Sequence, residues 1–237
     1  MEATVLVTGG RGGLGPAVTD AFLAGGWRVV TPLRRRPEPV AGGAGAEPVP
    51  GGGRLEVVEA DLVDPAAVER AAAHAAADPA APLRAVVNLA GGYAAGPRLH
   101  ETPPQEFERL LALNLRPTFL VTRAALPHLL AAGGGAVVCV SARTALQPFA
   151  GAVPYATAKA AVLAFAKAVA VEYRAMGVRC NTILPSVIDT PANRAAQPDA
   201  DHARWVPPAQ VAAVIRFLAG EESAPTSGAA VPVYGRA

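Results

Sequence analysis

Short apolar runs alternate along this chain with segments in which apolar residues recur at helical spacing. The runs predict buried strands, and most of them are followed by a helical pattern. The expected strands are residues 4–8, 28–33, 55–59, 85–88, 136–140, 178–184 and 229–233. The longest helical pattern covers residues 155–175. Asp64-Pro65 and Thr102-Pro103 are typical helix starts, because a polar N-cap precedes a proline at the first helical position.

Strands that are apolar throughout indicate a parallel sheet with helices on both faces. Right-handed crossovers then predict an α/β fold with a single Rossmann-type doubly wound sheet of about seven strands. The ligand site of such a sheet lies beyond the carboxyl ends of the strands, where the strand order reverses. We expect one domain over residues 1–237, with a flexible loop at the Pro- and Gly-rich residues 37–53.

Composition and charge narrow the function classes. A formal net charge of +2 gives no electrostatic argument for nucleic acid or an anionic membrane as a partner. No apolar run approaches the length of a membrane span, and no signal peptide precedes the first strand. Cys139 and Cys180 lie in strand-like runs, which favours buried thiols over a disulfide or a metal site. We therefore expect a cytoplasmic protein without a bound metal.

A glycine-rich turn joins the first strand to the first helix. Glycines at this place let the backbone approach a pyrophosphate at the positive end of the helix, so the turn predicts a dinucleotide site. The cofactor-binding residues expected here are Gly9, Arg11, Gly13, Leu14 and Gly15.

The end of the second strand bears on the choice of cofactor. A site for NAD usually has an acidic residue here to bind the ribose hydroxyls. This chain has Arg34 and Arg35 instead, followed by Arg36, and no acid before Glu38. Because arginines suit the 2′-phosphate of NADP, we expect NADP(H), with NAD(H) as the alternative cofactor. The alternative for the arginines is a solvated basic loop.

Candidate residues also follow the third and fourth strands. Asp61, before Leu62, would accept a hydrogen bond from the adenine amino group or would cap a helix. Asn88, Ala90 and Gly91 follow the fourth strand, where small residues would let the backbone approach the cofactor.

Asn114 and Tyr155 are the polar candidates inside helical patterns. Asn114 stands among leucines in mid-helix, where a poor helix former indicates a structural role or a proton relay. Tyr155 precedes Lys159 by four residues, so both side chains share one helix face. A nearby ammonium lowers the pKa of a phenol, which would turn Tyr155 into a usable acid.

In this order, the motifs resemble the short-chain dehydrogenase/reductase family over essentially the whole length. The resemblance implies hydride transfer between nicotinamide and a small carbonyl or imine, with Tyr155 as proton donor. Lys159 would bind the ribose and lower the pKa of Tyr155, while Asn114 would hold a water. The Ile188 backbone and Thr190 would hold the carboxamide, and Pro185 would be a further cofactor-binding residue. The resemblance also implies a homodimer or homotetramer built through the helices that carry Tyr155 and Asn114.

Two positions depart from that family's pattern. Ser186 stands where a glycine is usual. Ala142 stands where the family's catalytic serine is expected, thirteen residues before Tyr155. Ser141 would take that role if the loop over residues 143–152 held a one-residue insertion. Otherwise its side chain would point to the opposite face of the strand end.

Within the family, dihydropteridine reductases offer a closer resemblance, and they lack the serine. The similar stretches are residues 90–93, 142–146, 184–194, 198–205 and 227–228. A quinonoid dihydropterin is electron-poor and would need less polarisation than a ketone. The chain departs from those enzymes in its arginines after the second strand and in Asn114. A catalytically silent dinucleotide-binding protein is the alternative from another class.

A short lid over residues 190–206 implies a small or flat substrate. Tyr93, Phe149 and Trp205 would stack on such a substrate or would pack in the core or an interface.

Overall fold

The computed structural model describes residues 2–34 and 52–236. The predicted loop over residues 37–53 therefore lies almost wholly outside the described residues, as does Arg35. The seven strands are β1 (Thr4–Thr8), β2 (Arg28–Leu33), β3 (Arg54–Glu59), β4 (Leu83–Asn88), β5 (Gly135–Val140), β6 (Val178–Pro185) and β7 (Ala230–Val233). The helices are α1 (Gly15–Ala24), α2 (Pro65–Ala76), α3 (Pro104–Asn114), α4 (Arg116–Ala131), α5 (Val153–Tyr173), α6 (Pro191–Ala196) and α7 (Pro208–Ala219).

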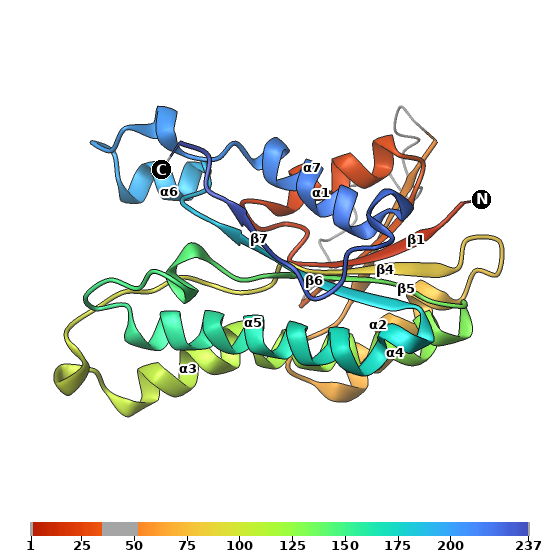
Figure 1. Ribbon diagram of the computed structural model, residues 1–237, viewed down its shortest axis with the longest axis horizontal. Coiled ribbons are helices and arrows are strands. Elements are labelled where there is room, and N and C mark those ends of the chain that lie inside the picture. The colour runs from red at the N-terminus through yellow and green to blue at the C-terminus, as the bar shows by residue number, and fades with distance from the viewer. Residues whose placement is uncertain (1, 35–51, 237) are drawn as a thin grey trace, which may run out of the picture.

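The strands form one parallel sheet in the order β3-β2-β1-β4-β5-β6-β7, which confirms the predicted fold class. The order reverses between β1 and β4, because the chain builds outward from β1 on one side and from β4 on the other. Figure 1 shows α1 and α7 on one face of the sheet and α2, α3, α4 and α5 on the other.

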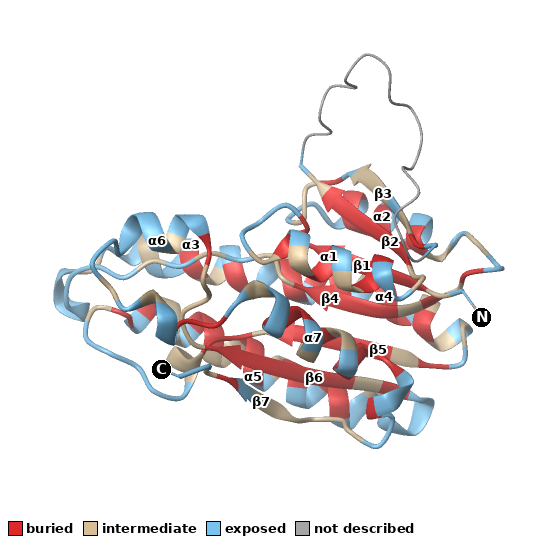
Figure 2. Cartoon of the chain, turned by 90° about the horizontal axis from the view of Figure 1, so that it is seen from above, coloured by how far each residue is buried: buried red, intermediate tan, exposed pale blue. Residues whose placement is uncertain are grey.

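Both faces of the sheet are apolar, as the uninterrupted strand runs predict. Val5 and Val7 point into the core beneath α1 and α7, whereas Leu6 points into the core beneath α2, α4 and α5. This alternation follows from the two-residue period of a strand. Figure 2 shows the central strands buried along most of their length.

The helical segment around Asn114 differs from the prediction. Asn114 is the last residue of α3, and α4 begins two residues later at Arg116. Pro117 explains the break, because proline has no N–H for the carbonyl of Leu113 and its ring crowds that carbonyl. The expected cap at Thr102 is also wrong: its hydroxyl donates to the Arg98 carbonyl, and α3 begins at Pro104. The cap at Asp64 is confirmed, since its side chain accepts from the Ala66 N–H.

The helix α5 corrects a second expectation. The segment Val153–Met176 is long and apolar enough to cross a membrane by length and composition. It nevertheless packs against β6 and α3, and Val162, Ala166 and Val169 lie in the core. It is therefore a buried core helix of a soluble fold.

Candidate active site

The glycine-rich turn lies at the carboxyl end of β1, against the loops that follow β4 and β6. Gly9 has a φ of +69°, and a Cβ atom there would meet the Ala90 nitrogen at 3.0 Å. A Cβ atom on Gly13 would meet the Thr190 methyl at 2.9 Å. Arg11 is exposed and Leu14 half-buried ahead of the first turn of α1, at Gly15. The turn therefore leaves its backbone and the positive end of α1 open toward a pyrophosphate.

Two buried polar residues fix the strand ends beneath this turn. The Thr8 hydroxyl accepts from the Leu89 and Ala90 N–H groups, each at 3.1 Å. Asn88 donates to the Thr122 hydroxyl at 3.0 Å and to the Cys139 sulfur at 3.8 Å. Asn88 is 2% exposed, so its side chain lies under the site and joins β4 to α4 and β5. The bonds of Thr8 were not expected from the sequence, because they depend on the neighbouring strand.

Arg34 and Asp61 come together at the carboxyl ends of β2 and β3. Arg34 Nε lies 3.4 Å from Asp61 Oδ2, and the Arg34 side chain is 80% exposed. Asp61 also accepts from the Val63 N–H, while Asp64 caps α2. Leu62 packs on the core instead of facing outward. An exposed guanidinium held by a carboxylate at this edge is placed to meet the adenosine half of a dinucleotide.

Tyr155, Lys159, Asn114 and Gly91 form one cluster. Lys159 is 6% exposed; its Nζ donates to the Val140 carbonyl at 3.0 Å and lies 5.9 Å from the centre of the Tyr155 ring. A Cβ atom on Gly91 would meet Asn114 Oδ1 at 2.6 Å and Lys159 Nζ at 3.3 Å. Only glycine therefore fits between the amide and the ammonium.

The Asn114 side chain holds the loop that follows β4. Its Oδ1 accepts from the Gly92 N–H at 3.1 Å, and its Nδ2 donates to the Gly92 carbonyl at 3.0 Å and to the Leu110 carbonyl at 3.0 Å. The structural role that the sequence left open is therefore confirmed. The predicted water relay stays a prediction.

Burial dominates the protonation of the cluster. It raises the pKa of Tyr155 to about 12, with a further contribution from Tyr93, and lowers the pKa of Lys159 to about 8. The expectation that Lys159 lowers the pKa of Tyr155 is thus wrong, because burial is the main cause of the shift and the Lys159 ammonium bonds to the Val140 carbonyl instead. Tyr155 therefore carries its proton at neutral pH.

Ser141 lies close to this cluster but does not reach Tyr155 in it. Its hydroxyl is buried and donates to the Lys159 carbonyl at 2.7 Å, which pins the end of β5 to α5. Ala142 occupies the next position without a hydroxyl. Ser186 donates to the Tyr234 carbonyl at 2.8 Å, so the residue that stands for the usual glycine faces the C-terminal segment.

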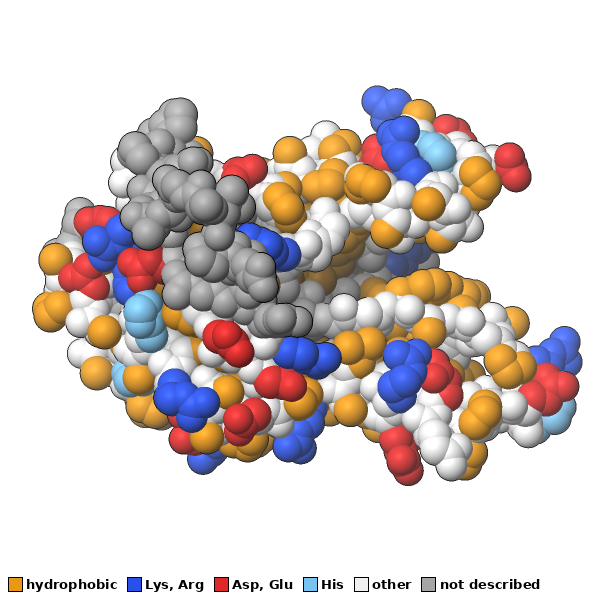
Figure 3. All heavy atoms as spheres, turned by 180° about the vertical axis from the view of Figure 1, so that it is seen from behind, with side chains coloured by type: hydrophobic (Ala, Val, Ile, Leu, Met, Phe, Trp, Pro, Cys, Tyr) orange, Lys and Arg blue, Asp and Glu red, His pale blue; other side chains and the backbone are white. Residues whose placement is uncertain are grey.

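The lid begins at the end of β6, after the buried Pro185. Thr190 caps α6 by accepting from the Asn193 N–H, and Asn193 Nδ2 donates to the Ile188 carbonyl at 2.8 Å. Arg194 forms two bonds with Asp189 and lowers the pKa of that carboxyl. Among residues 2–34 and 52–236, no acceptor takes the Ile188 N–H, which leaves it free for a carboxamide oxygen. Figure 3 shows a deep hollow, with apolar walls, between the lobe that carries the lid and the opposite lobe.

The three aromatic candidates for stacking differ in exposure. Trp205 is 7% exposed and packs on the His202 ring at 4.4 Å, so it belongs to the lid's own packing. Tyr93 and Phe149 are 62% and 49% exposed.

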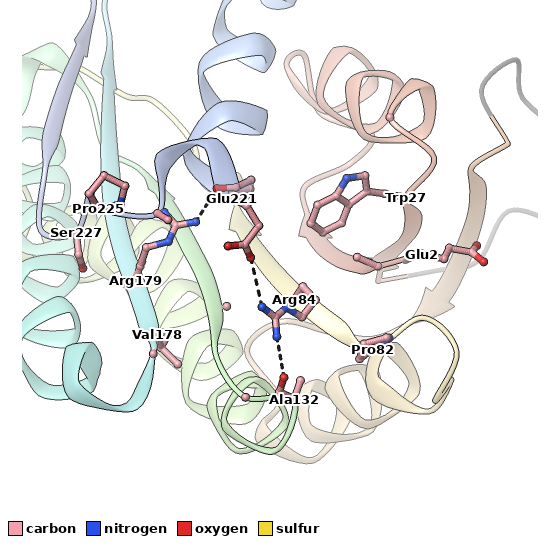
Figure 4. Close-up of a pocket in the computed structure, with 18 of the residues that line it drawn as sticks. Glu2, Trp27, Pro82, Arg84, Ala132, Val178, Arg179, Glu221, Pro225 and Ser227 are labelled. Atoms are coloured by element: carbon pink, nitrogen blue, oxygen red, sulfur yellow. Dashed lines mark hydrogen bonds and ion pairs between the residues drawn. The ribbon is translucent and has the colours of Figure 1, made fainter.

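A cavity lies away from this cluster, at the amino ends of the strands. It measures about 790 Å³ and includes Arg84, Arg179 and Glu221 in its lining (Figure 4). Arg84 donates to the Ala132 carbonyl and Arg179 to the Gly220 carbonyl, at the C-terminal ends of α4 and α7. Both arginines are thus engaged by carbonyl groups at the negative C-terminal ends of helices. A pyrophosphate binds instead at a positive helix N-terminus, so the cavity is not the dinucleotide site. The described part of the chain contains no group of three metal-ligating side chains.

Comparison with known proteins identifies one family model that matches most of the chain. The model described as short chain dehydrogenase matches residues 3–201. A 2-(R)-hydroxypropyl-CoM dehydrogenase of Xanthobacter autotrophicus is 36% identical and covers 99% of this chain and 98% of its own. A 2,5-dichloro-2,5-cyclohexadiene-1,4-diol dehydrogenase of Sphingobium indicum is 32% identical, over 97% and 94%. A short-chain type dehydrogenase/reductase structure from Mycobacterium ulcerans superposes with a TM-score of 0.88 at 26% identity, over 99% and 89%.

Proposed function

We propose that this chain, which belongs to the short-chain dehydrogenase family, reduces a small carbonyl or imine with hydride from NADPH. Membership makes it an NAD(P)-dependent oxidoreductase. The observation that carries the proposal is the half-buried Tyr155 beside the buried Lys159, at the carboxyl ends of the strands, where the glycine-rich turn and Ile188 also lie.

The residues of the site fit a nicotinamide dinucleotide. The turn over Gly9–Gly15 would hold the pyrophosphate, and Ile188 and Thr190 would hold the carboxamide. The bound cofactor supplies a hydride to the substrate carbon. Tyr155 gives its phenolic proton to the substrate oxygen or nitrogen, which acquires negative charge as the hydride arrives. Lys159, charged at neutral pH, stabilises the resulting phenolate until water restores the proton.

NADPH preference rests on Arg34. We expect Arg34→Ala, alone and with Arg35→Ala, to weaken NADPH binding by roughly tenfold to a hundredfold, since a charge-assisted bond contributes about 1.5–3 kcal/mol. NADH binding should change little. Arg123→Ala is the matched control, because Arg123 is also an exposed arginine paired with one carboxylate, Glu69. Dissociation constants for both cofactors measure the effect, and equal losses for NADH and NADPH would refute the preference.

The substrate class has two candidates. The relatives described above are dehydrogenases of hydroxyl-bearing compounds by their names, which supports a carbonyl in the reductive direction. None of them is a dihydropteridine reductase. Ala142 favours the second candidate, a quinonoid dihydropterin, because a conjugated imine needs less help from a serine hydroxyl.

We place the enzyme in the cytoplasm as a homodimer or homotetramer, with no nucleic-acid or membrane partner. Two buried free thiols and the soluble fold support this location.

A substrate panel tests the proposal. NADPH consumption is followed with ketones, cyclic imines and quinonoid dihydropterin, and NADH serves as the comparison cofactor. Turnover of one class is the expected result. Tight NADPH binding without turnover of any member would favour the catalytically silent alternative.

A further inference from the structure

Tyr93 is an exposed aromatic residue that touches the proton donor. Its ring centre lies 5.1 Å from that of Tyr155, with the two rings at 83°. Most of its surface nevertheless has no protein neighbour, since the residue is 62% exposed. A large aromatic side chain left open beside a reactive group offers a free face for a ligand to stack on.

The position of Tyr93 is fixed by the same residue that organises the cluster. Asn114 bonds both the N–H and the carbonyl of Gly92, the residue before Tyr93. A Cβ atom on Gly92 would meet the Leu113 side chain at 2.6 Å, so the backbone is also held by close packing. Tyr93 is therefore placed on a supported loop and not on a free one.

A second loop lies beside the loop that carries Tyr93. The Gly96 N–H donates to the Gly151 carbonyl at 3.0 Å and joins the loop of Tyr93 to the segment before α5. That segment exposes Leu146 and Phe149, which are 55% and 49% exposed. Residues 92–97 and 146–152 contain no charged side chain. The two joined loops thus present uncharged, largely apolar surface.

We propose that Tyr93 determines substrate specificity, by stacking on a planar, uncharged, unsaturated ring of the substrate while Tyr155 faces the group to be reduced. The inference rests on the proposed function and names the substrate class of that site. A ring parallel to Tyr93 lies nearly at right angles to Tyr155, in keeping with the 83° between the two tyrosines. An aliphatic ring of the same size would lose the stacking contribution but keep the apolar contact.

Acetophenone and cyclohexyl methyl ketone form a matched pair, because they share the carbon skeleton and the carbonyl while only one has a planar ring. The ratio of kcat/KM for the two ketones is measured in the wild type, Tyr93→Leu and Tyr93→Phe. We expect acetophenone to be preferred by the wild type. The preference should fall roughly threefold to tenfold in Tyr93→Leu, which keeps an apolar side chain, and should be retained in Tyr93→Phe. Phe217→Leu, an exposed aromatic on α7, is the control and should keep the ratio.

Binding of the two ketones is measured in the NADPH complex of Tyr155→Phe, alone and combined with each Tyr93 substitution. This measurement separates the inference from the proposed function. A change in the ratio of dissociation constants without any wild-type turnover would support Tyr93 and count against the reductase activity. No preference in the wild type, or an unchanged preference in Tyr93→Leu, would overturn the role of Tyr93.

Discussion

The sequence could not decide whether Ser141 has a structural role or replaces the catalytic serine that is missing at Ala142. The Ser141 hydroxyl bonds the backbone of α5, so Ser141→Ala should lower the free energy of unfolding by about 1 kcal/mol. It should leave kcat of the folded enzyme nearly unchanged. Ala142→Ser, in contrast, should raise kcat for a simple ketone more than for a conjugated imine. Urea unfolding and steady-state kinetics on both variants check this. A large loss of kcat in Ser141→Ala with normal stability would show that Ser141 is the catalytic serine.

At this scale, spacing identified most of the candidate site. Tyr155 and Lys159 share a helix face, and Gly9 and Gly13 permit close approaches, because both features follow from local geometry. The roles of Asn88 and Thr8 depend on strands and helices distant in sequence, which spacing does not reveal. The pKa of Tyr155 depends on total burial, which no local pattern predicts.

The strand β3 at the sheet edge is held by a network of charged groups. Glu56 bonds Arg28, which is 4% exposed, through both carboxylate oxygens and also contacts His74. Arg28, above all, holds the pKa of Glu56 down at about 2. The folded pKa is below that of the unfolded chain, so the stabilisation is present above pH 4.5 and is lost as the pH falls toward 2.

We expect Glu56→Gln to destabilise the protein by about 2 kcal/mol at pH 7, and by progressively less below pH 4.5. Glu69→Gln is the control, since both members of the Glu69–Arg123 pair are more than half exposed; it should cost about 0.5 kcal/mol or less. Urea unfolding at equal protein concentration from pH 7 to pH 3 measures both. Equal costs for the two variants, or a cost for Glu56→Gln that is independent of pH, would contradict this account.

Elements were predictable where periodicity or a cap marks them. All seven strands and the cap at Asp64 follow the sequence. Asn114 was wrongly expected in mid-helix because the leucines continue their spacing across the break, although Pro117 was the available signal. The Asp-Thr-Pro-Ala-Asn-Arg run of the lid has a local explanation: Asp189, Thr190, Asn193 and Arg194 bond one another or the lid backbone to form α6. These residues therefore stabilise the conformation of the lid, and their presence does not by itself indicate a pteridine substrate.

At the scale of the whole molecule, exposed apolar side chains lie on the outer side of α4 and α5. Phe119 is 47% and Val171 71% exposed, and Phe119 packs on Phe165 of the neighbouring helix. Ala164 and Ala168 are also exposed on α5, where small side chains allow close helix packing. This surface includes α5, the helix that carries Tyr155, but it adjoins α4 and not α3, which ends at Asn114. We propose that assembly uses this surface.

We predict that the wild type sediments as a dimer or tetramer and that Ala168→Arg shifts it to a smaller species. Ala73→Arg, an exposed alanine on α2, is the control and should leave the mass unchanged. Analytical ultracentrifugation at several concentrations measures the distribution. A monomeric wild type, or an Ala168→Arg variant of unchanged mass, would show that this face is not the interface.

The central claim is that Tyr155 delivers a proton to a substrate reduced by NADPH. Tyr155→Phe keeps the ring and its contact with Tyr93 but removes the proton, so it isolates that step. The most direct test compares NADPH oxidation by the wild type and Tyr155→Phe with the best substrate of the panel, alongside the dissociation constant for NADPH. We predict that turnover falls at least about a hundredfold while NADPH affinity changes less than about threefold. Unchanged turnover in Tyr155→Phe would contradict the account.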